Sequence, residues 1–371
     1  MKMGLIVNPI AGMGGRVGLK GTDDVIEEAI RRGAQPVAPD RCIEFIGDLK
    51  KSMGKLPLKV VTCPGMMGEE ESKTVSLPVE VLDMEIGDKT TAEDTRTAVK
   101  LMVERDVELI VFVGGDGTAR DIFDALKKEE VPVLGIPSGV KMYSGIFAVN
   151  PSDAVEVVSA FAQNQTDTAD LEIMDADERA IREDTFSIEI YGYLKAPFLP
   201  MRVQGGKQVT PSTVNEKENQ TAIARFIIEE MDPEETYLLG PGTTVKRITE
   251  LLGVDKTLLG VDIYKEGRVI LDVNEREILE EVEDWENTWI ILSPIGHQGL
   301  LLGRGNQQIS PKILKKLKKK RIIVAATKGK IQSIEGEVLR VDTGNEKINK
   351  MIRGEIKVLT DYAEWRILPV K

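Results

Sequence analysis

The sequence predicts an α/β protein with an N-terminal doubly wound, mostly parallel sheet and a second domain of mixed α+β structure, rich in strands. Three observations predict this class. Short apolar segments alternate with amphipathic segments up to about residue 160, as in repeated strand-helix-strand units. Glycine-rich turns follow several apolar segments, which is where open α/β sheets bind ligands. Beyond residue 160 this regular alternation is replaced by half-buried strand patterns.

The expected elements of the first half form a Rossmann-like succession. Its strands are short and rich in Val, Ile and Leu, which is typical of strands buried on both faces. Its helices are indicated by capping residues and by apolar side chains at helical spacing. The expected strands are 4–9, 58–63, 79–84, 109–113 and 131–136, and the expected helices are 23–32, 90–105, 119–126 and 150–163.

The stretch LIVFVGGDGTARDIFDAL, residues 109–126, is the centre of this half. Its glycines let the backbone turn sharply and approach a ligand without a Cβ in the way, and the first amides of the next helix are anion donors. Asp116 is the only acid in the turn, and a carboxylate beside a phosphate is useful when it binds a metal or accepts a proton. A tight turn with an incidental Asp is the alternative, which we consider weaker. The candidate phosphate-binding residues here are Gly114, Gly115, Gly117 and Thr118.

Two other turns follow expected strands of the same sheet. The segment NPIAGMGGRVG comes directly after the first strand, and its position favours a ligand loop over a plain linker. The second turn follows strand 131–136. Candidate nucleotide-binding residues in the two turns are Asn8, Gly12, Gly14, Gly15, Ser138 and Gly139.

Glu93 and Asp94 lie in the first turn of helix 90–105. Acids there suit the helix dipole, which is a sufficient structural reason for them. The same edge of the sheet would also receive a ligand, so we keep both residues as candidates for substrate binding.

The second half begins at about residue 161, giving expected domains of 1–160 and 161–371. We expect its apolar C-terminal stretch to be tied down, and packing on the first domain is one arrangement left open. The expected strands are 185–191, 237–239, 288–292, 322–325, 338–341 and 355–359, and the expected helices are 213–231, 243–252 and 310–321, whose basic second half, KKLKKKR, is expected to be solvated.

Two loops of the second half carry ligand-binding residue types. The turn GPGTT, residues 240–244, offers amides and hydroxyls to a phosphate through Gly242, Thr243 and Thr244, and an ordinary N-cap by either threonine is an equal alternative. The later loop combines glycines with polar side chains, a density that favours ligand contact over solvent exposure. Its candidate substrate-binding residues are His297, Arg304, Asn306 and Gln307.

The composition excludes several classes of protein. A net charge of -12 argues against a general binder of nucleic acid or of anionic membranes. The sequence contains one His and two Cys, which is too few for most zinc sites or for a disulfide framework, and we expect a cytoplasmic protein. No stretch is apolar enough to cross a membrane, and the strand-like start argues against a signal peptide.

The remaining chemistry points to phosphoryl transfer. No GXXXXGK[ST] motif is present, and the first loop lacks the spacing of a dinucleotide-binding dehydrogenase. Phosphoryl transfer requires positioning, Mg²⁺ and a group that takes the proton of the acceptor. Asp116 could be that base, or could bind the Mg²⁺ ion.

The motifs NPIAGMGGRVG, GGDGTARD, GPGTT and GRGNQQISP, in this order, resemble those of the ATP-NAD kinase family over nearly the whole chain. The resemblance is greatest to the predicted ATP- or polyphosphate-dependent NAD kinases of archaea and bacteria, including a branch associated with acetoin catabolism. It implies that Asp116 is the catalytic acid and that GPGTT stands in the place of a GPTGS-like phosphate loop. It also implies a ribose-binding role for Asn215 and Glu216, a weak match to the family's Asn-Glu pair.

This resemblance implies Mg²⁺, a phosphoryl donor that is ATP or polyphosphate, and NAD(H) as the acceptor at its ribose 2′-hydroxyl. It also implies a homo-oligomer. Another small hydroxylated metabolite is the second candidate for the acceptor. A lipid kinase, which shares GGDGT, and a nucleotide-sensing protein that binds without transfer are rival functions that the sequence leaves open.

Overall fold

A computed structural model describes residues 1–19, 26–53, 58–87, 89–126, 129–139, 142–176, 188–199, 203, 214–296, 298–317 and 321–371. The chain forms two compact units. Unit 1 comprises Met1–Met13 and Gly21–Lys207, and unit 2 comprises Gly14–Lys20 and Gln208–Lys371. The expected α/β architecture with a second mixed domain is confirmed.

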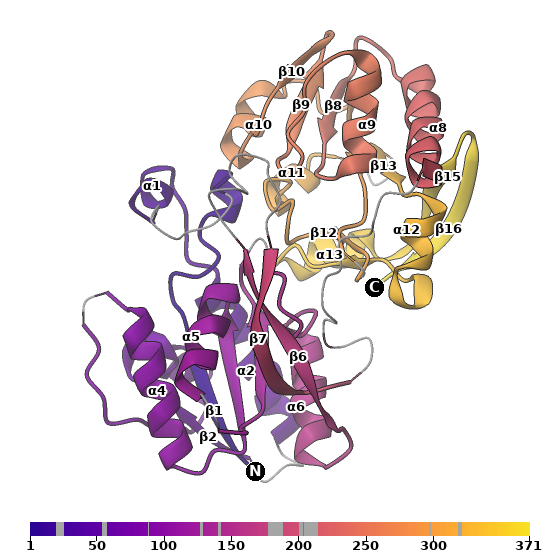
Figure 1. Cartoon of the computed structure of the whole chain (residues 1–371). Helices are drawn as coiled ribbons and strands as arrows, with labels where there is room; N and C mark the ends of the chain where they lie inside the picture. Colours follow the sequence, from indigo (N-terminus) through magenta and orange to yellow (C-terminus); the bar gives the residue numbers. More distant parts are fainter. Residues whose placement is uncertain are drawn as a thin grey trace. The chain divides into compact units, whose positions relative to one another are not determined.

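Unit 1 is built on a five-stranded parallel sheet in the order β3-β2-β1-β4-β5, of which Figure 1 labels β1 and β2. β2 and β3 lie on one side of β1, and β4 and β5 lie on the other side. The boundary between β1 and β4 is therefore a topological switch point. β4 is buried along its whole length, as its apolar sequence predicts. The strands are β1 (Lys2–Val7), β2 (Lys59–Thr62), β3 (Glu80–Val81), β4 (Leu109–Gly114) and β5 (Val133–Pro137).

The helices of unit 1 pack in two pairs, α4 with α5 and α2 with α6 (Figure 1). α2 was not predicted from the sequence, because prolines and charged residues obscure its amphipathic pattern; its buried side chains include Phe45, Ile46 and Leu49. The helices are α1 (Ile26–Arg31), α2 (Ala38–Met53), α3 (Glu69–Thr74), α4 (Ala92–Glu104), α5 (Asp116–Leu126) and α6 (Pro151–Ala162), with the 3-10 turn η2 (Gly65–Met67). The 3-10 turn η1 (Gly15–Val17) belongs to unit 2.

An antiparallel pair, β6 (Thr168–Ala176) and β7 (Ile188–Pro197), extends unit 1 beyond the expected boundary at residue 160. β6 contacts α5 and β7 contacts β5. β6 was not predicted from the sequence, because residues 169–180 are acidic. The expected strand 185–191 lies partly outside the described residues. These contacts place the pair in unit 1, and the division falls at residue 207.

Glu71, in the first turn of α3, is a buried acid, 5% exposed, that predicts a pH-dependent stability for the protein. Burial raises the pKa of Glu71 to about 7 from its ordinary 4.5. Because the pKa of Glu71 is higher in the folded state, this group contributes to the free energy of unfolding. The contribution is complete at pH values below the pKa of the unfolded state and is lost as the pH rises through about 7. We expect the free energy of unfolding to fall by up to about 3 kcal/mol between pH 5 and pH 8 from this group.

Urea unfolding of Glu71→Gln between pH 5 and pH 8 checks this prediction. The variant should lose most of that dependence and be the more stable protein at pH 8. The exposed neighbour Glu70 provides the control, because Glu70→Gln should keep nearly the full dependence. Parallel pH profiles for Glu71→Gln and the wild type would show that Glu71 is not the titrating group.

Unit 2 has a seven-stranded mixed sheet in the order β10-β9-β8-β11-β13-β15-β16. Its central strands β8, β11, β13 and β15 are parallel, and antiparallel strands complete both sides. A separate pair joins β12 and β14. The strands are β8 (Thr236–Leu239), β9 (Asp262–Lys265), β10 (Arg268–Ile270), β11 (Thr288–Leu292), β12 (Leu300–Leu302), β13 (Ile322–Ala325), β14 (Arg340–Val341), β15 (Gly354–Asp361) and β16 (Glu364–Val370).

The helices of unit 2 include α8 and α9, which pack beside each other (Figure 1). The expected helix 310–321 is wrong in length, since α11 ends at Leu314 and residues 315–317 follow it as a turn. Residues 318–320 lie outside the described part. The apolar C-terminal stretch forms β16 and pairs with β15, so it is held in the fold as expected. The helices are α8 (Val214–Glu230), α9 (Thr243–Leu252), α10 (Glu275–Glu281), α11 (Pro311–Leu314), α12 (Lys328–Gln332) and α13 (Glu346–Ile352), with the 3-10 turn η4 (Glu335–Glu337).

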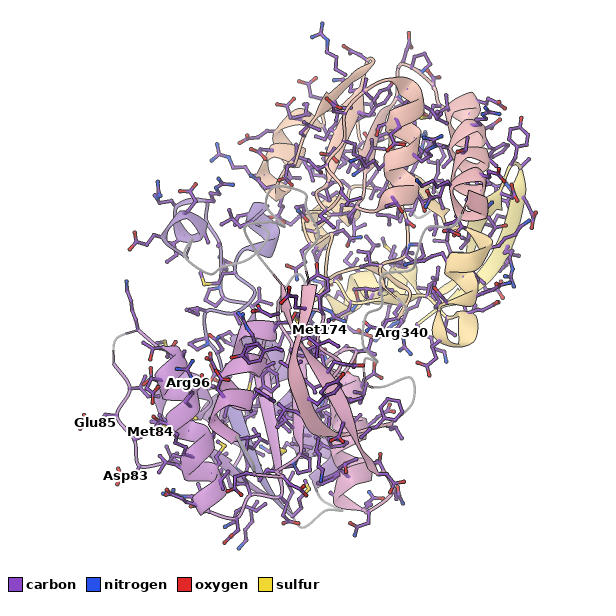
Figure 2. All side chains as sticks on the ribbon, viewed as in Figure 1. Asp83, Met84, Glu85, Arg96, Met174 and Arg340 are labelled. Atoms are coloured by element: carbon purple, nitrogen blue, oxygen red, sulfur yellow. The ribbon has the colours of Figure 1, made fainter. Side chains whose placement is uncertain are left out.

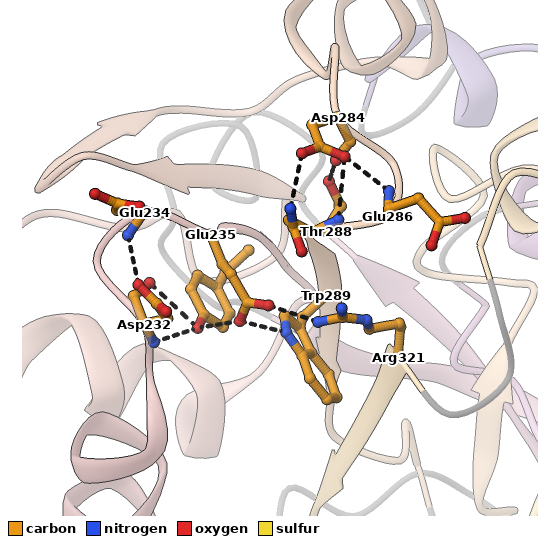
Figure 3. Close-up of polar contacts among 10 residues, drawn as sticks. Asp232, Glu234, Glu235, Asp284, Glu286, Thr288, Trp289 and Arg321 are labelled. Atoms are coloured by element: carbon orange, nitrogen blue, oxygen red, sulfur yellow. Dashed lines mark hydrogen bonds and ion pairs between the residues drawn. The ribbon is translucent and has the colours of Figure 1, made fainter.

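A polar network ties together the amino ends of β8, β11 and β13 (Figure 3). Glu235 accepts hydrogen bonds from Trp289 Nε1 at 2.6 Å and from Arg321 at 2.6 Å, and the Arg321 guanidinium lies over the Trp289 ring. Ligands of parallel sheets bind at the opposite, carboxyl ends of the strands. We therefore assign this network to stability. No helix in the described part of the chain could span a membrane.

Candidate active site

The turns predicted to bind phosphate in unit 1 meet at the carboxyl ends of β1, β4 and β5. Asn8 follows β1, and its Nδ2 donates to the Oγ1 of Thr118 in α5 at 2.9 Å. The backbone amide of Ser138, after β5, donates to the carbonyl of Gly114 at 3.1 Å. Three loops far apart in the sequence are thereby joined at the switch point of the sheet.

Glycine is required at two positions of this junction. A Cβ on Gly12, whose φ is +82°, would lie 1.9 Å from the carbonyl oxygen of Ser138. A Cβ on Gly114 would lie 2.6 Å from Thr118 Oγ1. These two glycines therefore serve the close packing of the loops.

Gly115 differs from both, because a Cβ there meets no atom of the described residues within 4 Å. Its backbone faces open space beside Gly139, whose own Cβ would lie 3.7 Å from the Gly115 Cα. The nearby Ser138 hydroxyl is buried, and within the described residues it has no hydrogen-bond partner. Open backbone and a buried hydroxyl without a partner are features of a place that a polar ligand approaches.

Asp116 begins α5 and is partly buried. Its carboxylate accepts hydrogen bonds from the backbone amides of Tyr143 at 2.6 Å and Ser144 at 3.0 Å. Burial, and to a smaller extent the charge of Asp116, raises the pKa of the Tyr143 hydroxyl. The acid is thus held in a fixed orientation in front of the glycine turn.

The β6–β7 pair supports the loop that holds Asp116. The amide of Met174 in β6 (labelled in Figure 2) donates to Ser144 Oγ at 2.9 Å, and the amide of Gly145 donates to the carbonyl of Glu172 at 2.8 Å. Arg120 of α5 pairs with Asp175 of β6. Sequence reasoning missed this support, because backbone contacts leave no residue signature.

The candidates in helix α4 have structural partners. Asp94 forms a capping box with Thr91, accepting from its amide at 2.7 Å and its hydroxyl at 2.8 Å. Exposed Glu93 pairs at 3.4 Å with Arg96, which is labelled in Figure 2. Substrate binding by Glu93 and Asp94 remains a prediction.

The first glycine loop is divided between the units, since Gly12 belongs to unit 1 and Gly14 and Gly15 belong to unit 2. Gly15 begins η1, which contacts α10. Nucleotide binding by Gly14 and Gly15 therefore remains a prediction that does not follow from the packing in unit 1.

In unit 2 the GPGTT turn joins β8 to α9. Gly242, with φ +113°, is the N-cap and makes no side-chain cap, so the alternative of an N-cap by Thr243 or Thr244 is wrong. The Gly242 amide donates to the Leu258 carbonyl at 2.8 Å. Thr244 is buried, whereas exposed Thr243 accepts a hydrogen bond from Gln220 of α8 at 3.1 Å.

The other candidates of unit 2 are only partly brought together. Glu216 of α8 accepts from Thr327 at 2.5 Å, whereas the side chain of Asn215 and the whole of His297 lie outside the described part. Asn306 is fully buried and holds its own loop, through Gly303 N and the Leu301 carbonyl, both at 2.9 Å.

Arg304 and Gln307 belong to the same loop. Arg304 is buried and donates to Gln298 at 3.2 Å. The side-chain oxygen of Gln307 is buried and has no hydrogen-bond partner within the described residues. Their binding of substrate stays a prediction.

Comparison with known families matches both units. The family model of the ATP-NAD kinase N-terminal domain matches residues 3–166, and that of the ATP-NAD kinase C-terminal domain matches residues 232–370. The chain belongs to the ATP-NAD kinase family. No curated protein matches the chain. Residues 167–231, which include the β6–β7 pair of unit 1, lie outside both matched regions.

As a member of the ATP-NAD kinase family, the chain is a phosphotransferase, and the family generally uses ATP and a divalent cation. Within the described residues, no three His, Cys, Asp or Glu side chains gather to hold a metal. Mg²⁺ commonly takes one or two carboxylates together with substrate phosphates, so it does not need such a group. The single carboxylate Asp116 beside an open glycine backbone fits this mode of binding.

Proposed function

We propose that the protein transfers a phosphoryl group from ATP or polyphosphate to the ribose 2′-hydroxyl of NAD(H). The observation that carries the proposal is the fixed carboxylate of Asp116, held by two backbone amides next to a glycine turn with an open backbone. Membership of the ATP-NAD kinase family supports the same acceptor.

In this mechanism Asp116 accepts the proton of the attacking hydroxyl. The hydroxyl oxygen forms a bond to the terminal phosphorus as the bond from that phosphorus to the bridging oxygen of the donor breaks, giving NADP(H) and ADP or a shortened polyphosphate. Backbone amides of the Gly114–Thr118 turn would hold the donor phosphates, with Ser138 and Gly139 beside them. Mg²⁺, bound with Asp116 and the phosphates, would offset the charge of the transferred group.

Unit 2 carries further candidates for substrate binding. Thr243 and Thr244 begin α9, where phosphate binding is favoured, and Glu216 carries an acceptor for a sugar hydroxyl. We include His297, Arg304 and Gln307 as substrate contacts and regard the active protein as a cytoplasmic homo-oligomer.

A panel of donors and acceptors tests the proposal. Purified protein with Mg²⁺ receives ATP or polyphosphate, with NAD or NADH, and an enzyme that accepts only NADP(H) reports the product. We expect product with at least one donor, and omission of Mg²⁺ should abolish it. Absence of product from every combination, with ATP still bound, would reject NAD(H) as the acceptor and favour another hydroxylated metabolite or a sensing role.

A further inference from the structure

The β6–β7 pair, which lies outside both regions that match the ATP-NAD kinase models, contains a β-bulge. Ile173 lies opposite Gly192, whereas Met174 lies opposite Ile190, so Tyr191 is an extra residue on β7. A bulge interrupts the ladder of hydrogen bonds and bends the strand, and bulges are common beside active sites. The residues at this bulge make contacts outside the β6–β7 pair in two directions.

The first contact leads to the loop that holds Asp116. The amide of Met174 donates to Ser144 Oγ at 2.9 Å. Ser144 is completely buried, and its own amide donates to Asp116 Oδ1 at 3.0 Å. One residue therefore joins the bulge to the carboxylate, because β6 fixes the hydroxyl of Ser144 and the amide of Ser144 fixes Asp116.

The second contact leads to α5, the helix that Asp116 begins. The hydroxyl of Tyr191 donates to Asp124 at 3.0 Å, and its ring packs edge-on against Phe123 at a centroid distance of 5.6 Å. Gly192 permits this approach, because a Cβ there would lie 2.4 Å from the Phe123 ring. The bulge is thus held against α5 as well as against the loop.

An ion pair closes a ring of contacts around the carboxylate. Asp175, the residue after Met174 in β6, pairs with Arg120 of α5. Arg120 is four residues after Asp116, so the two residues lie on the same side of the helix. We call Asp116, Ser144, Met174, Asp175 and Arg120 the Ser144 ring. Opening this ring at Ser144 or Arg120 should misplace the carboxylate without removing a candidate contact to the substrates.

We propose that Ser144 and Arg120 are positioning residues for phosphoryl transfer, which act through the β6–β7 pair to fix the direction in which the Asp116 carboxylate faces the attacking hydroxyl. This inference deepens the proposed function, on which it rests for the role of Asp116 as the base. A displacement of about 1 Å at a reacting group can cost about 100-fold in rate. Because the bound substrates keep their contacts, the loss should appear in kcat and not in KM.

Steady-state kinetics of Ser144→Ala and Arg120→Met tests the proposal. Each variant should lower kcat by about 10- to 100-fold and keep KM for both substrates within about twofold of the wild type. Arg120→Lys keeps the cation and should recover most of the lost rate. Lys195→Met is the matched control for Arg120→Met, because Lys195 ties the same β6–β7 pair to Glu130 at 2.6 Å, outside the Ser144 ring. It should keep the kcat of the wild type.

Hydrogen exchange separates this inference from the proposed function. The amides of residues 143 and 144 should exchange at least about 10-fold faster in Ser144→Ala and in Arg120→Met, because Asp116 holds them less firmly, and at the wild-type rate in Lys195→Met. Faster exchange in a protein that forms no NADP would support the Ser144 ring while rejecting the proposed acceptor.

Three results would overturn the proposal. One is wild-type exchange of both amides in Ser144→Ala and Arg120→Met. The second is a rise in KM with an unchanged kcat, which would make Arg120 a contact to the substrate. The third is an equal loss of kcat in Arg120→Met and Lys195→Met, which would show that the β6–β7 pair serves the stability of the fold alone.

Discussion

Asp116→Asn is expected to lower kcat for phosphoryl transfer by about 10²- to 10⁴-fold, because the amide cannot accept the proton of the attacking hydroxyl. The protein should remain folded. Asn keeps one oxygen for the amides of Tyr143 and Ser144, so we expect a cost of about 1–3 kcal/mol, limited to the contact with that loop. Steady-state kinetics with a thermal unfolding curve measures both effects.

Asp121→Asn is the control for this variant. Asp121 lies on the same helix, pairs with Arg96 at 2.8 Å and accepts no hydrogen bond from the loop 142–144 in the described part. Loss of the charge of Asp121 should reduce the stability of the protein slightly and leave kcat near the wild-type value. Unchanged kcat in Asp116→Asn would remove this residue from the mechanism, and equal losses in both variants would make the effect structural.

Gly115→Val should weaken nucleotide binding by about 10- to 100-fold, as expected when one or two charge-assisted hydrogen bonds are blocked. A Cβ on Gly115 meets no atom of the described residues within 4 Å and φ is not left-handed, so we expect the valine side chain to occupy space that a ligand would use. Valine is a poor residue before a helix, which should cost about 1 kcal/mol of stability. Titration with ATP and NAD, together with a thermal unfolding curve, measures the two effects.

Gly12→Ala provides the contrast. Its Cβ would overlap the Ser138 carbonyl at a left-handed φ, so we expect loss of stability before loss of binding. Unaltered affinity of Gly115→Val for both nucleotides would show that the Gly114–Thr118 turn does not hold the phosphates.

The sequence predicted those features that depend on local patterns. β4 could be predicted from a continuous apolar run, and the turn after it from three glycines around one acid. The expected strand 79–84 is shorter in the structure, where β3 has only two residues, both exposed, at the edge of the sheet. The helix α2 and the strand β6 were missed, since charged residues dilute the patterns of both.

The supporting contacts of the site could not be predicted. Asp116 is held by backbone amides of residues 143 and 144, and any residue type could supply those amides. Gln220 comes from a helix whose sequence resembles an ordinary polar surface, and only the packing of α8 against α9 brings it to Thr243. Tertiary topology, which no local pattern encodes, decides these positions.

The central claim is that Asp116 takes part in transfer of a phosphoryl group to NAD(H). Incubation of the wild type and Asp116→Asn with Mg²⁺, NAD and ATP labelled in its γ-phosphate tests it most directly, with the label followed into separated products. The account predicts label in the 2′-phosphate of NADP for the wild type and almost none for the variant. Label that appears only as inorganic phosphate, or equally in NADP from both proteins, would contradict it.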